Sequence, residues 1–283
     1  MDLATRRRFL AEELQACCNL RSPALVEALA TVPREQFLRP GPWAIQGEGD
    51  IATGPRQTPD ADPKHVCHNV SVAIDPARRL FNGSPNVVAT AIDALALQPG
   101  GRVLHIGCGL GYYTALIARM VGPTGHVCAV EVDETLAREA TRNLSMEPNV
   151  EVRHGNGTEP IGGQLDAILV NAGLTLPPDA WLDAIVVGGR IVMPVTATMP
   201  QMGTIGKGLM VAATKVSDGS FDARTVSMVA IYSAVGIRDE GLNEAIGKAL
   251  MRGPFVPLER LRRDPHEQSP SCWVHGPTMC LSC

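Results

Sequence analysis

The stretch Arg102–Val132, RVLHIGCGLGYYTALIARMVGPTGHVCAVEV, decides the fold of this chain. An apolar run predicts a strand over 103–106, three glycines follow it, and a mostly apolar run over 112–121 predicts a helix that a Gly-Pro pair ends. A second apolar strand is expected over 127–132, with Glu131 near its end. This order predicts a β-α-β unit whose loop lies at the carboxyl edge of a parallel sheet, where α/β folds bind ligands.

The three glycines of this unit suit a nucleotide-binding loop. Gly107, Gly109 and Gly111 let the backbone turn tightly and approach a ligand, and the first amides of the following helix point outward. Glu131 lies 20 residues beyond the last glycine (131 minus 111), where a carboxylate can accept hydrogen bonds from a ribose. A dinucleotide fingerprint would need glycine in place of Tyr112, and no Gly-Lys-Ser/Thr phosphate loop follows. Both of those nucleotide classes are therefore excluded.

The GxGxG spacing, with both strands, the helix and the closing acid in place, resembles motif I of the class I S-adenosylmethionine-dependent methyltransferases. The resemblance implies S-adenosyl-L-methionine as the cofactor and S-adenosyl-L-homocysteine as its product. It also implies a set of cofactor-binding residues, namely Gly107, Cys108, Gly109, Gly111, Tyr112, Glu131, Val132, Asn156, Gly157 and Asn171.

Length and composition bound the class of protein. The 283 residues are 45% hydrophobic, enough to build the core of one large domain or of one and a half. A net charge of −4 gives no basic surplus, so a nucleic-acid partner is not expected. No apolar run approaches the roughly 18 residues of a membrane span, and no signal peptide is visible. Eight scattered cysteines suit reduced thiols, so we expect a cytoplasmic protein.

The segments before the glycine loop are helical at first and then irregular. Apolar residues recur at near-helical spacing over 1–40. Residues 41–80 are rich in Pro, Gly and Asp, and we interpret them as an ordered loop or small irregular subdomain that acts as a lid or binding segment. Ser84 and Pro85 then predict the start of a helix.

The segments after the glycine loop alternate between strand and helix patterns up to about residue 195, which predicts a mainly parallel sheet with helices on both faces. Two strand-like runs, 208–216 and 224–235, are separated by a turn without a helix and predict an antiparallel hairpin. The fold class expected is α/β, a Rossmann-like class I methyltransferase. Helical runs are expected over 239–252 and 255–263, followed by an irregular tail.

The expected organisation has three parts: an N-terminal helical segment and lid region (1–80), a cofactor-binding methyltransferase domain (81–237), and a C-terminal helical extension and tail (238–283). Nothing in the sequence indicates an oligomeric state.

Several segments together resemble the protein-L-isoaspartate O-methyltransferase family over roughly residues 24–200. They are VPREQFLRP (32–40), HIGCGLGYYTALIA (105–118), Gly155-Asn156-Gly157, DAILVNAG (166–173) and GGRIVMPV (188–195). The resemblance implies carboxyl O-methylation of an isoaspartyl-type peptide or protein.

Three positions depart from that family's pattern. His105 stands where the family usually has an acid, and Asn156 replaces an aspartate, although its amide oxygen can still accept a hydrogen bond from the adenine amine. Gly83-Ser84-Pro85-Asn86 replaces the family's Ser-x-Pro-His element at the substrate site. Ser84, Asn82 and Asn86 are therefore our candidate catalytic residues, which would orient the acceptor; Ser84 also suits a helix N-cap.

The acceptor stays open at this level. A carboxylate is ionised at pH 7 and needs only alignment with the methyl group. A hydroxyl or amine acceptor would need a base, for which His65, His68 and Asp75 are the candidates. Asn171 suits either a substrate contact or a turn. A small molecule or biosynthetic peptide as acceptor, and a non-catalytic binding module, are the alternatives.

The C-terminal tail contains Cys272, His275, Cys280 and Cys283, residue types that bind zinc. A single CxxC without a partner pair is a weak signal, and we expect no metal site from it.

Overall fold

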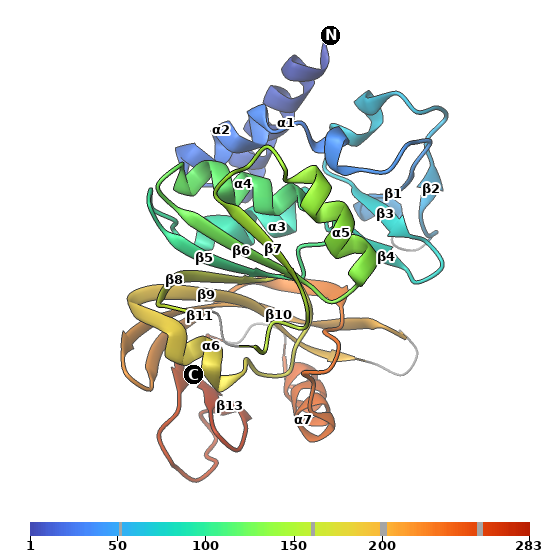
Figure 1. Ribbon diagram of the computed structural model, residues 1–283. Helices are drawn as coiled ribbons and strands as arrows, with labels where there is room; N and C mark the ends of the chain where they lie inside the picture. The colour runs from blue at the N-terminus through green and yellow to red at the C-terminus, as the bar shows by residue number, and fades with distance from the viewer. Residues whose placement is uncertain (51–52, 160–161, 199–202, 254–256) are drawn as a thin grey trace.

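The computed structural model describes residues 1–50, 53–159, 162–198, 203–253 and 257–283 (Figure 1). Its centre is a ten-stranded sheet in the order β13-β14-β12-β11-β10-β9-β8-β5-β6-β7. The strands that pair in parallel are β5 (Arg102–Ile106), β6 (His126–Glu131), β7 (Val150–His154), β8 (Leu165–Val170) and β9 (Ile185–Thr198). The antiparallel part adds β10 (Ile205–Ser217), β11 (Ser220–Tyr232), β12 (Arg260–Arg262), β13 (Cys272–His275) and β14 (Cys280–Ser282).

Helices cover both faces of this sheet because successive side chains of each strand point to opposite faces. In β5, Val103 packs in the core of one face and Leu104 in the core of the other. The first face carries α3 (Pro85–Ala94), α4 (Tyr112–Val121) and α5 (Glu134–Asn143), with α1 (Leu3–Cys18) and α2 (Pro23–Thr31) as an outer layer. The second face carries α6 (Asp179–Ala184) and α7 (Glu240–Met251).

The crossover direction explains this division. On one side of β5 the sheet continues with β6 and β7, and on the other side it continues with β8 and β9. The chain therefore crosses from β5 to β6 in one direction and from β8 to β9 in the opposite direction. Right-handed crossovers therefore place α4 and α5 on one face and α6 on the other. The predicted α/β class, the β-α-β unit and the antiparallel hairpin of β10 and β11 are confirmed.

The segment 41–80 forms a small antiparallel sheet of its own, in the order β2-β1-β3-β4. The strands are β1 (Ala44–Gln46), β2 (Arg56–Gln57), β3 (Ser71–Asp75) and β4 (Leu80–Phe81), with short 3-10 turns at Arg34–Phe37, Glu48–Asp50 and Pro63–Val66. Trp43, Ile45, Val66, Val70 and Val72 form its separate core. Strands this short leave no readable periodicity, which is why the sequence indicated only an irregular subdomain.

The C-terminal segment differs from the prediction. The helix expected over 239–252 is confirmed as α7. In the helix expected over 255–263, residues 255 and 256 lie outside the described part of the chain, and 260–262 form strand β12, so that prediction is wrong. The tail expected to be irregular contains β13 and β14. Leu261 is buried opposite Phe221 of β11, so pairing with a distant strand overrides the local preference.

Among the described residues, no helix is both long and apolar enough to cross a membrane.

Candidate active site

The glycine loop after β5 has the backbone that only glycine adopts readily. Gly107, Gly109 and Gly111 have φ values of +74°, +55° and +95°. A Cβ atom on Gly111 would also lie 2.8 Å from the Leu144 side chain, too close for contact. The Gly107 amide donates to the Val130 carbonyl over 2.8 Å, which fixes the loop to β6. The loop is therefore held at the carboxyl edge of the sheet, as the sequence predicted.

Glu131 ends β6 directly beside this loop. Its side chain is 7% exposed. One carboxylate oxygen accepts the Gly109 amide over 2.8 Å, and the other accepts the Asp133 amide over 3.0 Å. Each oxygen of a carboxylate offers about two acceptor sites, so each retains one for a ribose hydroxyl. The residue thus shapes the loop, and its role in ribose binding stays a prediction.

The opposite wall comes from the loop after β8. The Asn171 amide donates to the Ile106 carbonyl over 2.8 Å, and a Cβ on Gly107 would lie 3.3 Å from the Asn171 carbonyl oxygen. The structure therefore places Asn171 against the glycine loop. Gly157, after β7, lies against Ile106, where a Cβ would approach within 2.4 Å.

Asn156 departs from its expected role. Its side-chain oxygen accepts hydrogen bonds from the Thr158 amide (3.1 Å) and the Thr158 hydroxyl (2.7 Å). Both acceptor sites of that oxygen are engaged, so a bond from an adenine amine requires the side chain to rotate. The amide nitrogen faces the chain that follows β11, 3.6 Å from a Cβ built on Gly236.

Three further residues, Tyr112, Cys108 and Val132, were predicted to bind the cofactor. The Tyr112 ring is buried against Phe37 and Tyr113, with the Arg34 guanidinium 5.8 Å from its centre. Only its backbone at the start of α4 is suited to meet a ligand. The Cys108 thiol is buried, and burial raises its pKa. Val132 is 41% exposed and its carbonyl accepts a bond from His154 over 3.1 Å.

The small sheet covers the glycine loop. Ile74 of β3 packs with Leu110, next to Gly109, and with Leu136 of α5. Arg78, in the turn after β3, forms an ion pair with Asp133 over 2.6 Å. Figure 1 shows β3 and β4 beside α5. We call residues 41–80 the lid; its length alone indicated this role, and its individual contacts were not predicted.

Arg34 ties the lid to the segment before α3, which sequence reasoning missed. It is 2% exposed and donates to the carbonyls of Val66, His68 and Val70 and to the Asn82 side-chain oxygen, over 2.7 to 3.2 Å. The sequence offered one indication of its importance, which is that Arg34 lies within the VPREQFLRP motif.

The predicted catalytic segment Asn82–Asn86 leads into α3 and lies next to α4. The Tyr113 hydroxyl, in the first turn of α4, donates to the Gly83 carbonyl over 3.0 Å. Ser84 occupies the N-cap position, yet its hydroxyl makes no capping hydrogen bond. The Asn82 side-chain nitrogen and the Asn86 side-chain oxygen are buried, and neither has a partner among the described residues. The segment thus contains three polar groups without a hydrogen-bond partner in the described part of the chain, and Tyr113 ties it to the first turn of the helix that follows the glycine loop.

The three base candidates have other roles. His65 lies 2.8 Å from Asp60 on an exposed corner of the lid. His68 is exposed. Asp75 accepts the amides of Ala77 and Arg78 and so holds the turn after β3. They do not form one cluster.

His105 is fully buried in β5, and its Nδ1 lies 2.9 Å from the Thr114 hydroxyl. Burial lowers its pKa to about 3, so the ring is neutral. Its Nε2 has no partner among the described residues.

The chain after β11 also reaches this edge of the sheet. Because β11 is antiparallel to β10 and β10 to β9, β11 ends where the parallel strands end. Ser233 bridges Gly173 in the loop after β8. Arg238 donates to the Gly173 carbonyl (2.6 Å) and the Thr196 carbonyl (2.7 Å), and burial lowers its pKa. No sequence pattern predicted these contacts.

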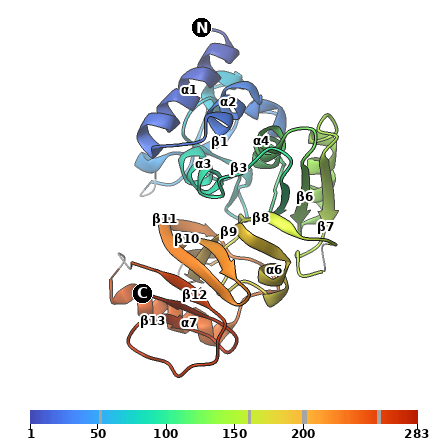
Figure 2. The same cartoon turned by 90° about the vertical axis from the view of Figure 1, so that its left-hand side faces the viewer.

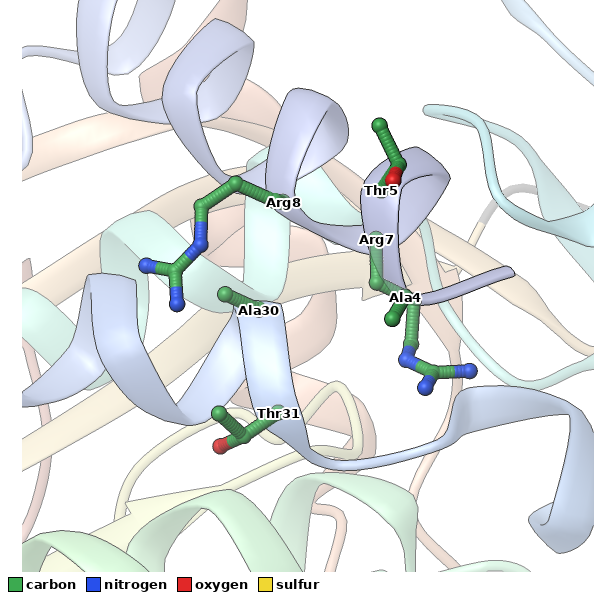
Figure 3. A pocket seen from close by; sticks show the side chains of 6 residues that line it. All are labelled: Ala4, Thr5, Arg7, Arg8, Ala30 and Thr31. Carbon is green, nitrogen blue, oxygen red and sulfur yellow. The ribbon is translucent and has the colours of Figure 1, made fainter. Parts of the chain in front are cut away.

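A surface hollow of about 500 Å³ lies elsewhere, between α1 and α2 (Figure 3). Its two arginines extend to opposite sides and form ion pairs, Arg7 with Glu35 (2.6 Å) and Arg8 with Glu27 (2.8 Å). It is lined by Ala4, Thr5, Arg7, Arg8, Ala30 and Thr31, none of which belongs to the glycine loop or to the segment 82–86. Figure 2 shows α1 and α2 from the side, outside the α3 and α4 layer.

Known proteins resemble this chain in sequence and in fold. The sequence model of the protein-L-isoaspartate(D-aspartate) O-methyltransferase family matches residues 69–236. The protein-L-isoaspartate O-methyltransferase of Methylorubrum extorquens is 31% identical over 244 residues, which cover 84% of this chain and 93% of that protein. Protein-L-isoaspartate O-methyltransferase 1 of Rhodopseudomonas palustris is 34% identical over 174 residues, 60% of each chain.

Two solved structures share the fold. One protein-L-isoaspartate O-methyltransferase superposes with a TM-score of 0.64 at 21% identity, covering 90% of this chain and 73% of the other. A putative enzyme of the same name from Plasmodium falciparum, in complex with S-adenosyl-L-homocysteine, superposes with a TM-score of 0.60 at 17% identity, covering 81% and 97%. With the family match and the full-length relative, these findings confirm the predicted fold and family: this chain belongs to the protein-L-isoaspartate O-methyltransferase family.

Proposed function

We propose that this chain transfers the methyl group of S-adenosyl-L-methionine to the carboxylate of an isoaspartyl residue in a peptide or protein. One observation carries the acceptor site. Three polar groups without partners, on Asn82, Ser84 and Asn86, lie at the start of α3, and Tyr113 holds that segment against the first turn of α4. This link to the helix that follows the cofactor loop supports the segment as the acceptor site.

The residues of the glycine loop fit the cofactor. Glu131 retains an acceptor site on each carboxylate oxygen for the two ribose hydroxyls. The loop glycines leave the backbone open to close approach, and Asn171 closes the opposite wall. When bound, S-adenosyl-L-methionine supplies a methyl group that its sulfonium has already activated.

The chain then needs to align the acceptor and exclude water. A carboxylate is ionised at neutral pH, so no base is required, which agrees with the other roles of His65 and Asp75. The Ser84 hydroxyl and the Asn82 amide donate to the acceptor carboxylate, and the Asn86 oxygen accepts from a peptide amide. The lid covers the loop and keeps water from the reacting atoms.

A methyl-transfer assay with radiolabelled S-adenosyl-L-methionine tests this proposal. We expect a base-labile methyl ester on an isoaspartyl peptide and none on the matched aspartyl peptide. Loss of one hydrogen bond to a charged group costs about 1.5–3 kcal/mol, so Ser84→Ala should lower kcat/KM about 10- to 150-fold. Ser145→Ala, at an exposed turn, is the control.

Two results would contradict the proposal separately. Esters on small acids but not on the isoaspartyl peptide would overturn the acceptor and keep the reaction. Tight S-adenosyl-L-homocysteine binding without transfer to any acceptor would identify a binding module.

A further inference from the structure

A group of metal-ligating side chains lies at the end of the molecule opposite α1 and α2 (Figure 1). His266 belongs to the loop before β13, Cys272 and His275 to β13, and Cys280 to β14. One ligand atom from each residue lies within 4.8 Å of every other. The sequence indicated Cys283 as the fourth member, but the structure brings His266 into the group instead.

The backbone of the β13–β14 hairpin explains why these side chains meet. His275 pairs directly with Cys280 across the two strands, so both side chains lie on one face. Residues three apart on a regular strand point to opposite faces. A register shift between Cys272 and Val274 inserts one extra residue, which turns Cys272 to the face of His275.

The nitrogen ligands are prepared for a metal. His266 donates from Nδ1 to the Asp264 carbonyl over 2.8 Å, which leaves the lone pair of Nε2 free, 3.7 Å from the Cys272 sulfur. The buried Nδ1 of His275 has no hydrogen-bond partner among the described residues. The two rings stand edge to face, with centres 4.8 Å apart.

The sulfur ligands are buried, with Cys272 3% exposed and Cys280 fully buried. The Ser269 amide donates to the Cys272 sulfur over 3.3 Å, as suits a thiolate.

We propose that His266, Cys272, His275 and Cys280 form a tetrahedral zinc site. Zn–S bonds of about 2.3 Å and Zn–N bonds of about 2.0–2.1 Å place the ligand atoms of a tetrahedron about 3.3–3.8 Å apart. The separation of 3.7 Å between His266 Nε2 and the Cys272 sulfur is already in that range. No other separation exceeds 4.8 Å, so none needs to contract by more than about 1.5 Å. Binding forms two Zn–S and two Zn–N bonds and releases the thiol protons to solvent, and two thiolates neutralise the Zn²⁺ charge.

Four protein ligands leave no open position, so the site is structural. It fastens the loop 263–271 to the hairpin that ends the ten-stranded sheet. Hard cations such as Mg²⁺ and Ca²⁺ prefer oxygen ligands and do not suit this group.

Metal analysis of the full-length chain, purified after removal of any affinity tag, tests the site. We expect about one zinc per chain in the wild type and at least a tenfold lower content in Cys272→Ser/Cys280→Ser. Cys283→Ser changes a neighbouring exposed thiol and should keep the metal. Wild-type protein without zinc that also fails to bind added Zn²⁺ would overturn the proposal, as would equal metal loss in Cys283→Ser.

A second measurement stays informative if the double variant does not fold. Chelator-treated wild-type protein is titrated with Co²⁺ alone, and a tetrahedral thiolate spectrum should saturate at about one equivalent and disappear on addition of Zn²⁺. Two thiols per chain should become protected from alkylation at the same time. A Cys272–Cys280 disulfide in the purified protein, seen as a mass two hydrogens lower, would overturn the zinc assignment. Neither readout depends on methyl transfer, so failure here leaves the proposed function standing.

Discussion

At the scale of single residues, Glu131 has a structural role besides the ribose binding that we propose for it. Its carboxylate accepts hydrogen bonds from the Gly109 and Asp133 amides and so holds the glycine loop in shape. Glu131→Ala should therefore weaken S-adenosyl-L-homocysteine binding by more than the about 1.5–3 kcal/mol of a lost charged hydrogen bond. Calorimetric titration measures this, with Glu134→Ala on exposed α5 as the control. An unchanged affinity would remove the carboxylate from the cofactor site.

His105 links a buried residue to the pH dependence of stability. Its pKa is about 3 in the folded chain, because burial disfavours the charged ring, against about 6.5 in an unfolded chain. Between those values only the unfolded state binds the proton, so the free energy of unfolding falls as the pH drops below about 6.5. From pH 7.5 to 5.0 the expected loss from this residue is about 2 kcal/mol.

His105→Gln should abolish that part of the pH dependence, because glutamine can keep the bond to Thr114 without titrating. Urea unfolding of both proteins at the two pH values measures the difference. His126→Gln changes a half-exposed histidine and is the matched control. Equal acid sensitivity of wild type and His105→Gln would place the titrating groups elsewhere.

At the scale of elements, the sequence predicted what local pattern determines. The unit β5-α4-β6 carries its own apolar periodicity, its glycines and its closing acid, and it formed as expected. The strands of the lid and β12–β14 are two to five residues long, and pairs such as β1–β3 and β11–β12 join segments more than 20 residues apart. Their pairing depends on tertiary contacts that no window of sequence contains.

The candidate site likewise contains residues that one local unit brings together and residues that only distant segments bring together. The glycines and Glu131 lie together because one local unit carries them, whereas the clamp of Arg34 joins segments 32 to 48 residues apart. His266 was not predicted as a ligand because it lies in the loop before β13, whose course the sequence does not show. The register shift that turns Cys272 to the same face is equally invisible in the sequence.

Arg34 tests how far the lid depends on one side chain. Arg34→Ala removes buried hydrogen bonds to the Val66 and Val70 carbonyls, and we expect a loss of about 2–6 kcal/mol in the free energy of unfolding. The His68 carbonyl and the Asn82 side-chain oxygen keep their bonds from the amides of residues 70 and 72. Arg34→Lys should recover part of this loss, since an ammonium group reaches fewer of these acceptors than the planar guanidinium. Urea unfolding gives the values, and limited proteolysis should show faster cleavage within 41–80. Arg8→Ala, at an exposed ion pair, is the control; equal effects at both positions would mean that Arg34 does not clamp the lid.

At the scale of the whole molecule, two cores share one sheet. Strands β5, β8 and β9 place alternate side chains in the core under α3 and α4 and in the core under α6 and α7. Lys215 of β10, only 7% exposed, adds a polar link by donating to the Ile185 carbonyl over 2.9 Å. Neither core can lose its order without exposing the other face of the same strands.

The chain should therefore unfold in one cooperative thermal transition, although the cofactor loop and the β13–β14 hairpin lie at different ends of the sheet. A ligand at 100 times its Kd stabilises the folded state by about 2.7 kcal/mol, which for a chain of this size raises Tm by about 4–5 °C. Differential scanning calorimetry with S-adenosyl-L-homocysteine should show the whole transition moving by that amount, with the calorimetric and van't Hoff enthalpies equal. Two separate transitions, of which the ligand moves only one, would mean that the C-terminal strands fold independently of the methyltransferase core despite the continuous hydrogen-bonded sheet.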